Sequence, residues 1–175
     1  EVLKNLPQFN HETESLYIDD PVFKNLYNKE LDLFSNFLNS AQKMNSTEIL
    51  GWLARIRNIT GMAKIGPITE LASDFLDSTE DPDEKLIIGI HHQGVRQILA
   101  ENLRAEHPDL EILELDGSHG PIEKNQIVDK FKTSKKARVL ICNVLAGGIG
   151  LNLQFCHNIW LMERQWSPTH EKQFW

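Results

Sequence analysis

After residue 85 the sequence alternates short apolar runs with amphipathic segments, and this alternation restricts the fold more than any other feature. Four of the runs are predicted strands, at residues 86–90, 110–115, 137–142 and 157–162. Helical patterns separate them at residues 95–106 and 121–131, and Ser167-Pro168 begins a further helix. Strands that alternate with helices of this length predict an α/β fold with a doubly wound parallel sheet.

The first 66 residues have a different pattern, which predicts a helical appendage that leads into the α/β part. The expected elements are a strand at 14–19, a helix that begins at Asp20-Pro21 and a helix capped by Ser46. After a break at Gly66-Pro67, a further helix is expected over 68–76. We therefore expect the strand and helical appendage over residues 1–66 and one lobe over residues 67–175.

Composition narrows the class of protein. Apolar residues make up 41% of the chain, which is enough for a packed core. No run approaches the roughly 18 apolar residues of a membrane span, so no membrane partner is expected. Cys142 and Cys156 stand in apolar surroundings, which predicts buried thiols rather than a disulfide, and the histidines have no zinc-site spacing.

The net charge of −7 argues weakly against a nonspecific nucleic-acid binder. Residues 124–138, however, carry six basic residues and one aspartate. This local basic segment is either a phosphate contact or an ordinary solvated face, and its charge alone leaves both interpretations open. The residues in question include Lys130, Lys132, Lys135 and Lys136.

Motifs for an independent active site are missing. A P-loop requires a lysine after its second glycine, but Pro67 follows Gly66. The glycines Gly148 and Gly150 begin a dinucleotide fingerprint, but Leu153 stands where a third glycine is required. His91 and His92 follow a strand and should point to opposite faces, which prevents them from chelating one metal. No residue is therefore predicted to be catalytic or to bind a metal.

Four loops follow the predicted strands and carry small, polar and glycine residues. They are HHQG at 91–94, DGSHG at 116–120, NVLAGGIG at 143–150 and ERQWSP at 163–168. In open parallel sheets, ligands bind at the carboxyl ends of the strands, which is where these loops lie. Backbone amides beside the glycines could hold phosphate oxygens without reading bases. The alternative is that these glycines only form tight turns.

Three long segments, residues 86–103, 113–132 and 137–173, resemble a known family in their order and spacing. They are similar to the second RecA-like lobe of Swi/Snf-type DNA-dependent ATPases, in helicase superfamily two. The first resembles motif IV, the second the "DGS" segment, and the third motif V followed by the start of motif VI. The paired histidines and ITGMAKI at 59–65 most resemble the annealing-helicase branch.

The resemblance implies a function in which ATP hydrolysis drives translocation along duplex DNA. Two RecA-like lobes close on ATP, and the first lobe, missing here, would bind ATP and Mg²⁺ chiefly through its P-loop and carboxylates. Motif VI arginines of the family stand about four and seven residues beyond Gln173, and the sequence stops before them. We therefore expect a piece of a longer ATPase, truncated within motif VI and inactive alone.

The resemblance also implies positions for the site residues. Contacts with the DNA backbone would come from His92, Gln93, Gly117, Ser118, Asn143 and Gly147. The ATP cleft would be approached by Gly148, Gly150 and Gln173. The chain departs from the usual Ser-Thr-Arg of motif V, with Asn143-Val144-Leu145 in its place. Asn143 keeps a side-chain donor, whereas Val144 has none.

The expected partners are double-stranded DNA and the first lobe, and the expected location is intracellular, in the nucleus of a eukaryote or the cytoplasm of a bacterium or archaeon. Two alternatives remain open. One is an RNA helicase lobe of the same superfamily, although Gly147-Gly148-Ile149-Gly150 replaces the Arg-Gly-x-Asp element usual there. The other is a non-catalytic protein-interaction domain on a RecA-like fold.

Overall fold

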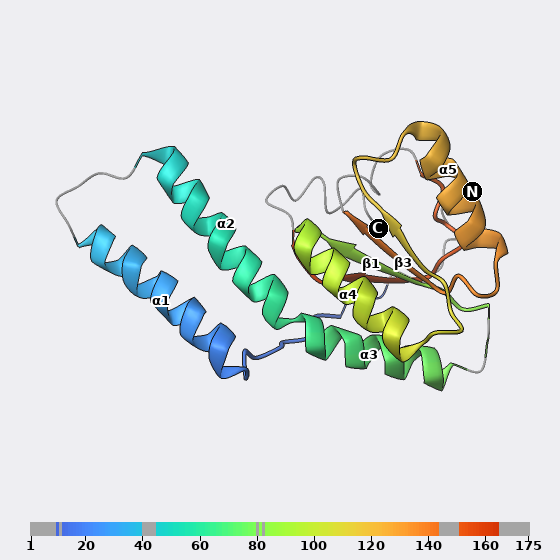
Figure 1. Cartoon of the computed structure of the whole chain (residues 1–175), viewed down its shortest axis with the longest axis horizontal. Coiled ribbons are helices and arrows are strands. Elements are labelled where there is room, and N and C mark those ends of the chain that lie inside the picture. Colours follow the sequence, from blue (N-terminus) through green and yellow to red (C-terminus); the bar gives the residue numbers. More distant parts are fainter. Residues whose placement is uncertain are drawn as a thin grey trace.

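The structure, a computed structural model, describes residues 10, 12–39, 45–79, 81, 83–143 and 151–164. Its centre is a four-stranded sheet with the order β2-β3-β1-β4, and all three strand pairs are parallel (Figure 1). The strands are β1 (Leu86–Ile90), β2 (Ile112–Leu115), β3 (Val139–Asn143) and β4 (Asn158–Leu161). The parallel α/β sheet expected from the sequence is confirmed, with each predicted strand in place.

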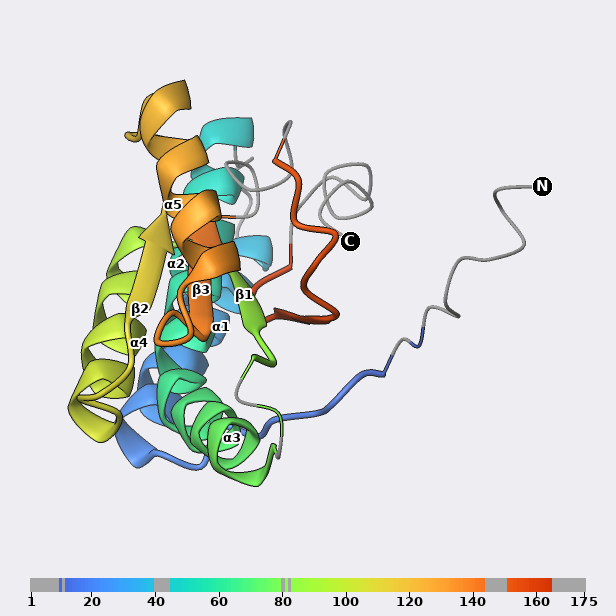
Figure 2. The same cartoon turned by 90° about the vertical axis from the view of Figure 1, so that its right-hand side faces the viewer.

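Helices cover both faces of this sheet, as a doubly wound fold requires. One face packs against α3 (Ile65–Ser78) and α4 (Gln93–Glu106), and the other against α5 (Pro121–Thr133). Figure 2 shows α4 and α5 on either side of the strands. Because both faces are covered, all five residues of β1 are buried, which explains its uninterrupted apolar sequence.

Alternate residues of the strands divide the core into two clusters. Leu86, Ile88 and Ile90 point toward α3 and α4, whereas Ile87 points toward α5. The second cluster contains the fully buried Phe131 of α5 and the two cysteines. Both cysteines are free and buried, as expected. Burial raises the pKa of Cys142 to about 12 and that of Cys156 to about 11, so both thiols stay protonated and unreactive at neutral pH.

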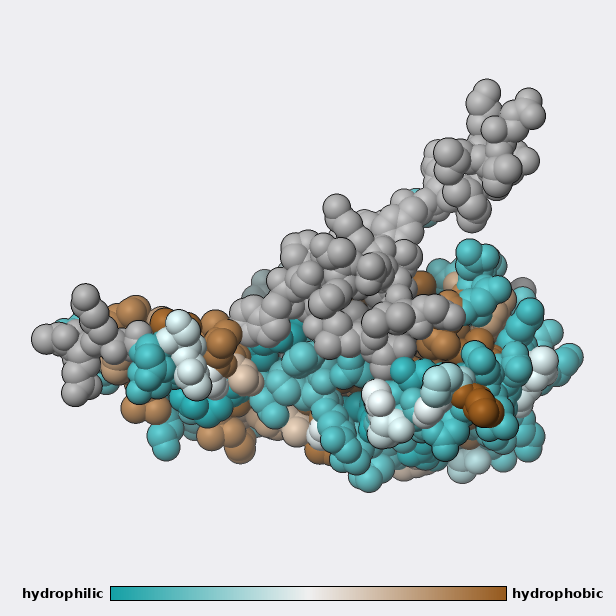
Figure 3. Space-filling view, turned by 90° about the horizontal axis from the view of Figure 1, so that it is seen from above, coloured by the Kyte–Doolittle hydropathy of each residue, from teal (hydrophilic) through white to brown (hydrophobic). Residues whose placement is uncertain are grey.

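The helices α1 (Pro21–Leu38) and α2 (Ser46–Ala63) pair into a hairpin that extends away from the sheet (Figure 1). Phe34 stacks on Trp52 with ring centroids 3.9 Å apart, and the Trp52 indole donates to the Glu30 carbonyl at 2.8 Å. No residue of α1 is fully buried. Several large apolar side chains of the hairpin stay exposed, and Figure 3 shows apolar residues gathered over this end of the molecule.

The hairpin confirms one expected cap and corrects another. The Asp20 carboxylate accepts from the Val22 amide at 2.7 Å, so α1 begins as predicted. The second cap is Asn45 rather than Ser46: its side chain accepts from the Glu48 amide, and Glu48 accepts from the Asn45 amide. Ser46 is instead the first helical residue of α2. Serine and asparagine have similar capping preference, so the sequence could not separate two adjacent candidates.

Two other expectations for the N-terminal region are wrong. Residues 14–19 form no strand, although Leu16 packs against the core. An alternating pattern also arises in an extended segment that packs one side without pairing. The expected break at Gly66-Pro67 lies inside α3, which begins at Ile65 and is separated from the end of α2 at Ala63 by Lys64 alone. Pro67 is tolerated there because the amides of the first helical turn need no intrahelical partner.

The boundary between residues 66 and 67 stays a prediction, as does the helix at Ser167-Pro168, which lies outside the described residues. Among the helices that the structure describes, none is both long enough and apolar enough to cross a membrane.

Candidate nucleic-acid interface

A recess of about 260 Å³ lies where β1, β2 and β3 end. The register places Ile90 beside Asn143 and Leu115 beside Cys142, so the residues that follow these strands meet at one edge of the sheet. The recess is lined by Ile90, His91, His92, Gln93, Arg96, Asp116, Gly117, Ser118 and Asn143. Five of the sequence-predicted contacts, His92, Gln93, Gly117, Ser118 and Asn143, are therefore brought together.

The turn after β2 is organised by Asp116. Its Oδ1 accepts from the Ser118 amide at 2.8 Å and from the Ser118 hydroxyl, and its Oδ2 lies 2.6 Å from Nη1 of Arg96. These bonds, led by the one from the Ser118 hydroxyl, lower the pKa of Asp116 to about 2. The Ser118 hydroxyl has one proton and gives it to Asp116, so in this arrangement it cannot also donate to a phosphate.

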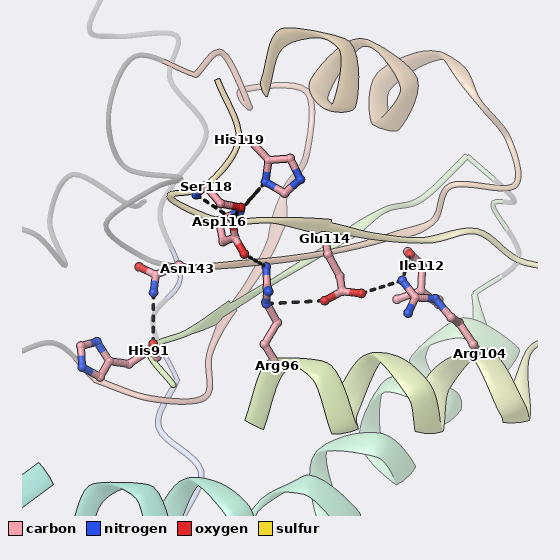
Figure 4. A network of polar contacts seen from close by, with 9 residues as sticks. All are labelled: His91, Arg96, Arg104, Ile112, Glu114, Asp116, Ser118, His119 and Asn143. Carbon is pink, nitrogen blue, oxygen red and sulfur yellow. Dashed lines mark hydrogen bonds and ion pairs between the residues drawn. The ribbon is translucent and has the colours of Figure 1, made fainter. Parts of the chain in front are cut away.

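Arg96 is the residue of this recess that sequence reasoning missed. It extends from α4 between two carboxylates, with Nε 3.5 Å from Glu114 and Nη1 2.6 Å from Asp116 (Figure 4). Arg104, eight residues further along α4, approaches the same Glu114 at 2.8 Å. A signal was present: Arg96 falls in the buried stripe of α4, and two carboxylates, Glu114 and Asp116, stand two positions apart at the end of β2, where a buried cation finds partners.

The turn after β1 is held by Glu163, which follows β4. One carboxylate oxygen accepts from the amides of His91 and His92 at 2.8 and 2.9 Å, and the other lies 2.6 Å from Nδ1 of His92. The two histidine rings contact each other edge to face, 4.8 Å apart. The expectation that they point to opposite faces is therefore wrong, because β1 ends at Ile90 and the strand alternation does not extend into the turn.

Asn143 and His91 are also engaged within the site. The Asn143 side-chain amide donates to the His91 carbonyl at 3.1 Å, which joins the ends of β3 and β1 (Figure 4). Burial, the charge of Arg57 and the neighbouring His92 lower the pKa of His91, so its neutral form is favoured. Asn143 thus ties two loops together through the donor that the sequence analysis assigned to phosphate.

The four lysines predicted from local charge lie away from this recess. Lys130 pairs with Glu111 at 3.2 Å, before β2 begins, and Lys135 lies 3.9 Å from Asp83, before β1 begins. Lys132 lies over the Phe155 ring, and Lys136 is exposed just before β3. The strands are parallel, so these positions mark the amino ends of the strands, the opposite edge of the sheet from the recess.

The remaining predicted site residues, Gly147, Gly148, Gly150 and Gln173, lie outside the described residues. Within the part of the chain that the structure describes, no group of three or more histidine, cysteine or acidic side chains is arranged to hold a metal ion.

Comparison with known proteins agrees with the fold. The model of the family described as the helicase conserved C-terminal domain matches residues 68–174, and the chain belongs to this family. The proteins it is similar to include a SWI/SNF-related regulator of chromatin of Xenopus tropicalis and DNA annealing helicases. Over 180 residues it is 24% identical to an uncharacterized ATP-dependent helicase of Mycoplasma pneumoniae, covering 98% of this chain and 17% of the relative.

Over 173 residues the chain is 22% identical to the DNA annealing helicase and endonuclease ZRANB3 of Bos taurus, covering 99% of this chain and 16% of the relative. It thus spans less than a fifth of the length of these two relatives. Among solved structures, the Sulfolobus solfataricus SWI2/SNF2 ATPase core in complex with dsDNA aligns with a TM-score of 0.72 at 20% identity, covering 86% of this chain and 34% of that one. This similarity shows the RecA-like lobe fold.

Proposed function

We propose that this chain is the second motor lobe of an ATP-dependent DNA translocase and that its recess binds the DNA backbone. The observation that carries the proposal is the convergence of the HHQG turn, the DGS turn and Asn143 at the carboxyl end of one parallel sheet. Ligands of such sheets bind there, and the Sulfolobus relative of the same fold was solved with dsDNA.

The chemistry of the recess suits a phosphate oxygen better than a base. The helix α4 begins at Gln93 beside the recess, so its first amides and the positive end of its dipole favour an anion. The negative charge of Asp116 is offset by Arg96 at 2.6 Å, which removes the repulsion that would keep a phosphate away. Backbone contacts of this kind position a duplex without reading its sequence.

The ATP side of the proposal rests on residues beyond the described part of the chain. Gly148, Gly150 and Gln173 would form one wall of the cleft, and a first lobe would hold ATP and Mg²⁺ and supply the P-loop. Residues 1–175 alone are then expected to hydrolyse no ATP above background, with or without DNA. DNA-stimulated hydrolysis by this chain alone would contradict this division of labour. Because DNA is its proposed track, the proposed location of the protein is inside the cell.

A glycine substitution tests the recess with little risk to folding. A Cβ at Gly117 meets no atom within 4 Å, so Gly117→Ala should fold normally while its methyl group narrows the recess. We expect a weakening of duplex binding of roughly threefold to tenfold, measured by fluorescence anisotropy at low salt. Gly66→Ala is the matched control, because its Cβ is equally unobstructed and lies in α3. Equal affinities of both variants and the unaltered chain would contradict a phosphate contact at Gly117.

The same anisotropy measurement, repeated at several salt concentrations, shows how much the lysines contribute to duplex binding. Each phosphate that the chain neutralises should add about −0.9 to the slope of log affinity against log salt. Neutralising Lys130, Lys132, Lys135 and Lys136 together should reduce this slope and add to the effect of Gly117→Ala, because the two groups lie at opposite edges of the sheet. Tighter, equally salt-dependent binding of single-stranded RNA would instead favour the RNA helicase alternative.

A further inference from the structure

We propose that Glu163 is a positioning residue for the DNA contact. It holds His92 in the tautomer with its proton on Nδ1, and this ring can donate a hydrogen bond to a phosphate only after it takes up a second proton. The inference rests on the proposed function, since it names the state in which that site binds DNA. Neither the helicase family match nor the fold assigns a role to Glu163.

The first step is the geometry around the carboxylate. The Glu163 side chain is 4% exposed, and its three acceptor contacts all go to the HHQG turn: two backbone amides and Nδ1 of His92. The N-cap position of α4 is His92, whose own side chain makes no capping bond. Glu163 therefore binds the amides of the N-cap residue and of the residue before it, so a DNA phosphate is left with the amides that follow in the first turn of α4.

The close packing of α2 supports a fixed carboxylate. A Cβ added at Gly61 would lie 2.5 Å from Oε1 of Glu163 and 3.0 Å from the Val95 side chain. Only glycine at this point of α2 leaves room for the carboxylate. The Lys64 ammonium donates to the Met162 carbonyl at 2.9 Å, which holds the chain just before Glu163. Glu163 thus has little freedom to move away from His92.

The second step is the position of the imidazole protons. An ionised carboxylate only accepts hydrogen bonds, so the 2.6 Å contact assigns a proton to Nδ1 of His92. The neutral ring then presents Nε2 as an acceptor, and no described residue gives Nε2 a hydrogen-bond partner. A phosphate oxygen is also an acceptor and repels that lone pair. Only the doubly protonated ring, with its charge offset by Glu163, can donate from Nε2 to a phosphate.

Other charged groups surround the pair and enter the test. From α2, Arg57 and Lys64 approach the HHQG turn and Glu163, and His91 contacts the His92 ring. Across the recess stand Arg96, Asp116 and His119, with His119 3.1 Å from Asp116. His119 is a further imidazole beside the recess, so a variant that removes it is part of the design.

The first measurement needs no DNA. Imidazole ¹⁵N chemical shifts of the unaltered chain at about pH 7.5 should show His92 protonated at Nδ1. In Glu163→Gln the single amide oxygen should stay with the two backbone amides, which turns the side-chain NH₂ toward Nδ1 of His92, and we expect the signal of His92 to move to the Nε2-protonated form. If His92 carries its proton on Nε2 while Glu163 is intact, the proposal is overturned.

The second measurement is duplex affinity against pH at constant salt. Because the bound state holds one more proton, affinity should rise roughly threefold to tenfold as pH falls from about 8 to about 6. Glu163→Gln should flatten this profile, since its His92 can donate from Nε2 without a second proton. His92→Asn should also flatten it, and adding Glu163→Gln to His92→Asn should change nothing more. His119→Asn should leave the difference between the unaltered chain and Glu163→Gln in place.

A purely structural role for Glu163 predicts something else: a lower melting temperature and an equal loss of affinity at every pH. Parallel pH profiles for the unaltered chain and Glu163→Gln would overturn the proposal. Failure of the proposed function looks different, because the unaltered chain would then show no salt-dependent duplex binding at any pH. In that case the ¹⁵N measurement still decides whether Glu163 sets the tautomer of His92.

Discussion

Replacing Arg96 by alanine should lower the free energy of unfolding by about 3 kcal/mol, because it leaves two carboxylates without their buried partner. The Arg96 side chain is only 8% exposed and lies between Glu114 and Asp116, both of which are largely buried. The remaining negative charges would repel each other at the end of β2, and the DGS turn would lose the contact that holds it to α4. The effect is measured by urea denaturation followed by circular dichroism.

Arg104→Ala is the matched control for this prediction. Arg104 stands on the same helix and approaches the same Glu114 at 2.8 Å, but its side chain is 45% exposed. Ion pairs of exposed side chains contribute little, so we expect a loss below about 1 kcal/mol. Equal losses for the two arginines would show that burial of Arg96 is not what makes its ion pairs important.

Replacing Phe131 by alanine should cost about 4 kcal/mol, the range for a large aromatic removed from a packed core. Its ring is fully buried between α5 and the sheet, where it contacts the Phe155 ring at a centroid distance of 5.6 Å. The helix α5 covers one whole face of the sheet and begins directly after the DGS turn. Its loosening should therefore weaken duplex binding as well as stability.

Ile122→Ala on the same helix gives the comparison. Ile122 is 74% exposed, so its loss should change stability by no more than about 0.5 kcal/mol. Urea denaturation of both variants under identical conditions measures the difference. Similar midpoints for Phe131→Ala and Ile122→Ala would contradict the packing of α5 as the cover of the second face.

The parallel sheet was predictable from sequence because its strands are buried on both faces and its helices carry one apolar side. Burial sets these patterns, so they can be recognised from the spacing of apolar residues in the sequence. The segment up to Pro67 was less predictable, because its local pattern does not report burial alone. Residues 14–19 alternate without pairing, and Pro67 looks like a helix breaker although it stands in a first turn. Whether a segment pairs as a strand, and where a helix begins, depend on contacts with distant residues that the local sequence does not reveal.

For the site, the sequence placed the turns and missed the side chains that hold them. His92 and Ser118 were expected to face a ligand, and their loops do meet at the recess. Arg96 and Glu163 were not singled out, because each acts on a turn distant in sequence: Glu163 reaches His92 across 71 positions. Contacts of that separation follow from the order β2-β3-β1-β4, which the strand patterns alone do not give.

The four lysines show the reverse: they stand near the DGS turn in sequence, and their charge suggested that they share a DNA-binding surface with it, but they lie far from it in the structure. Lys130, the first of them, stands only ten residues after Gly120, but the four lysines lie in the last turn of α5 or beyond it, after this helix has carried the chain back across the sheet. A helix of 13 residues spans about 20 Å, enough to move them to the other edge. Their contribution to DNA binding is thus separate from that of the recess.

Amide hydrogen exchange in the presence and absence of a short DNA duplex tests the central claim most directly. The account predicts slower exchange at residues 91–94 and 116–120, the two described turns at the carboxyl end of the sheet, with little change in the α1–α2 hairpin. Protection confined to the hairpin, or absent from both turns under conditions in which the duplex is bound, would contradict a motor lobe that holds DNA at this edge.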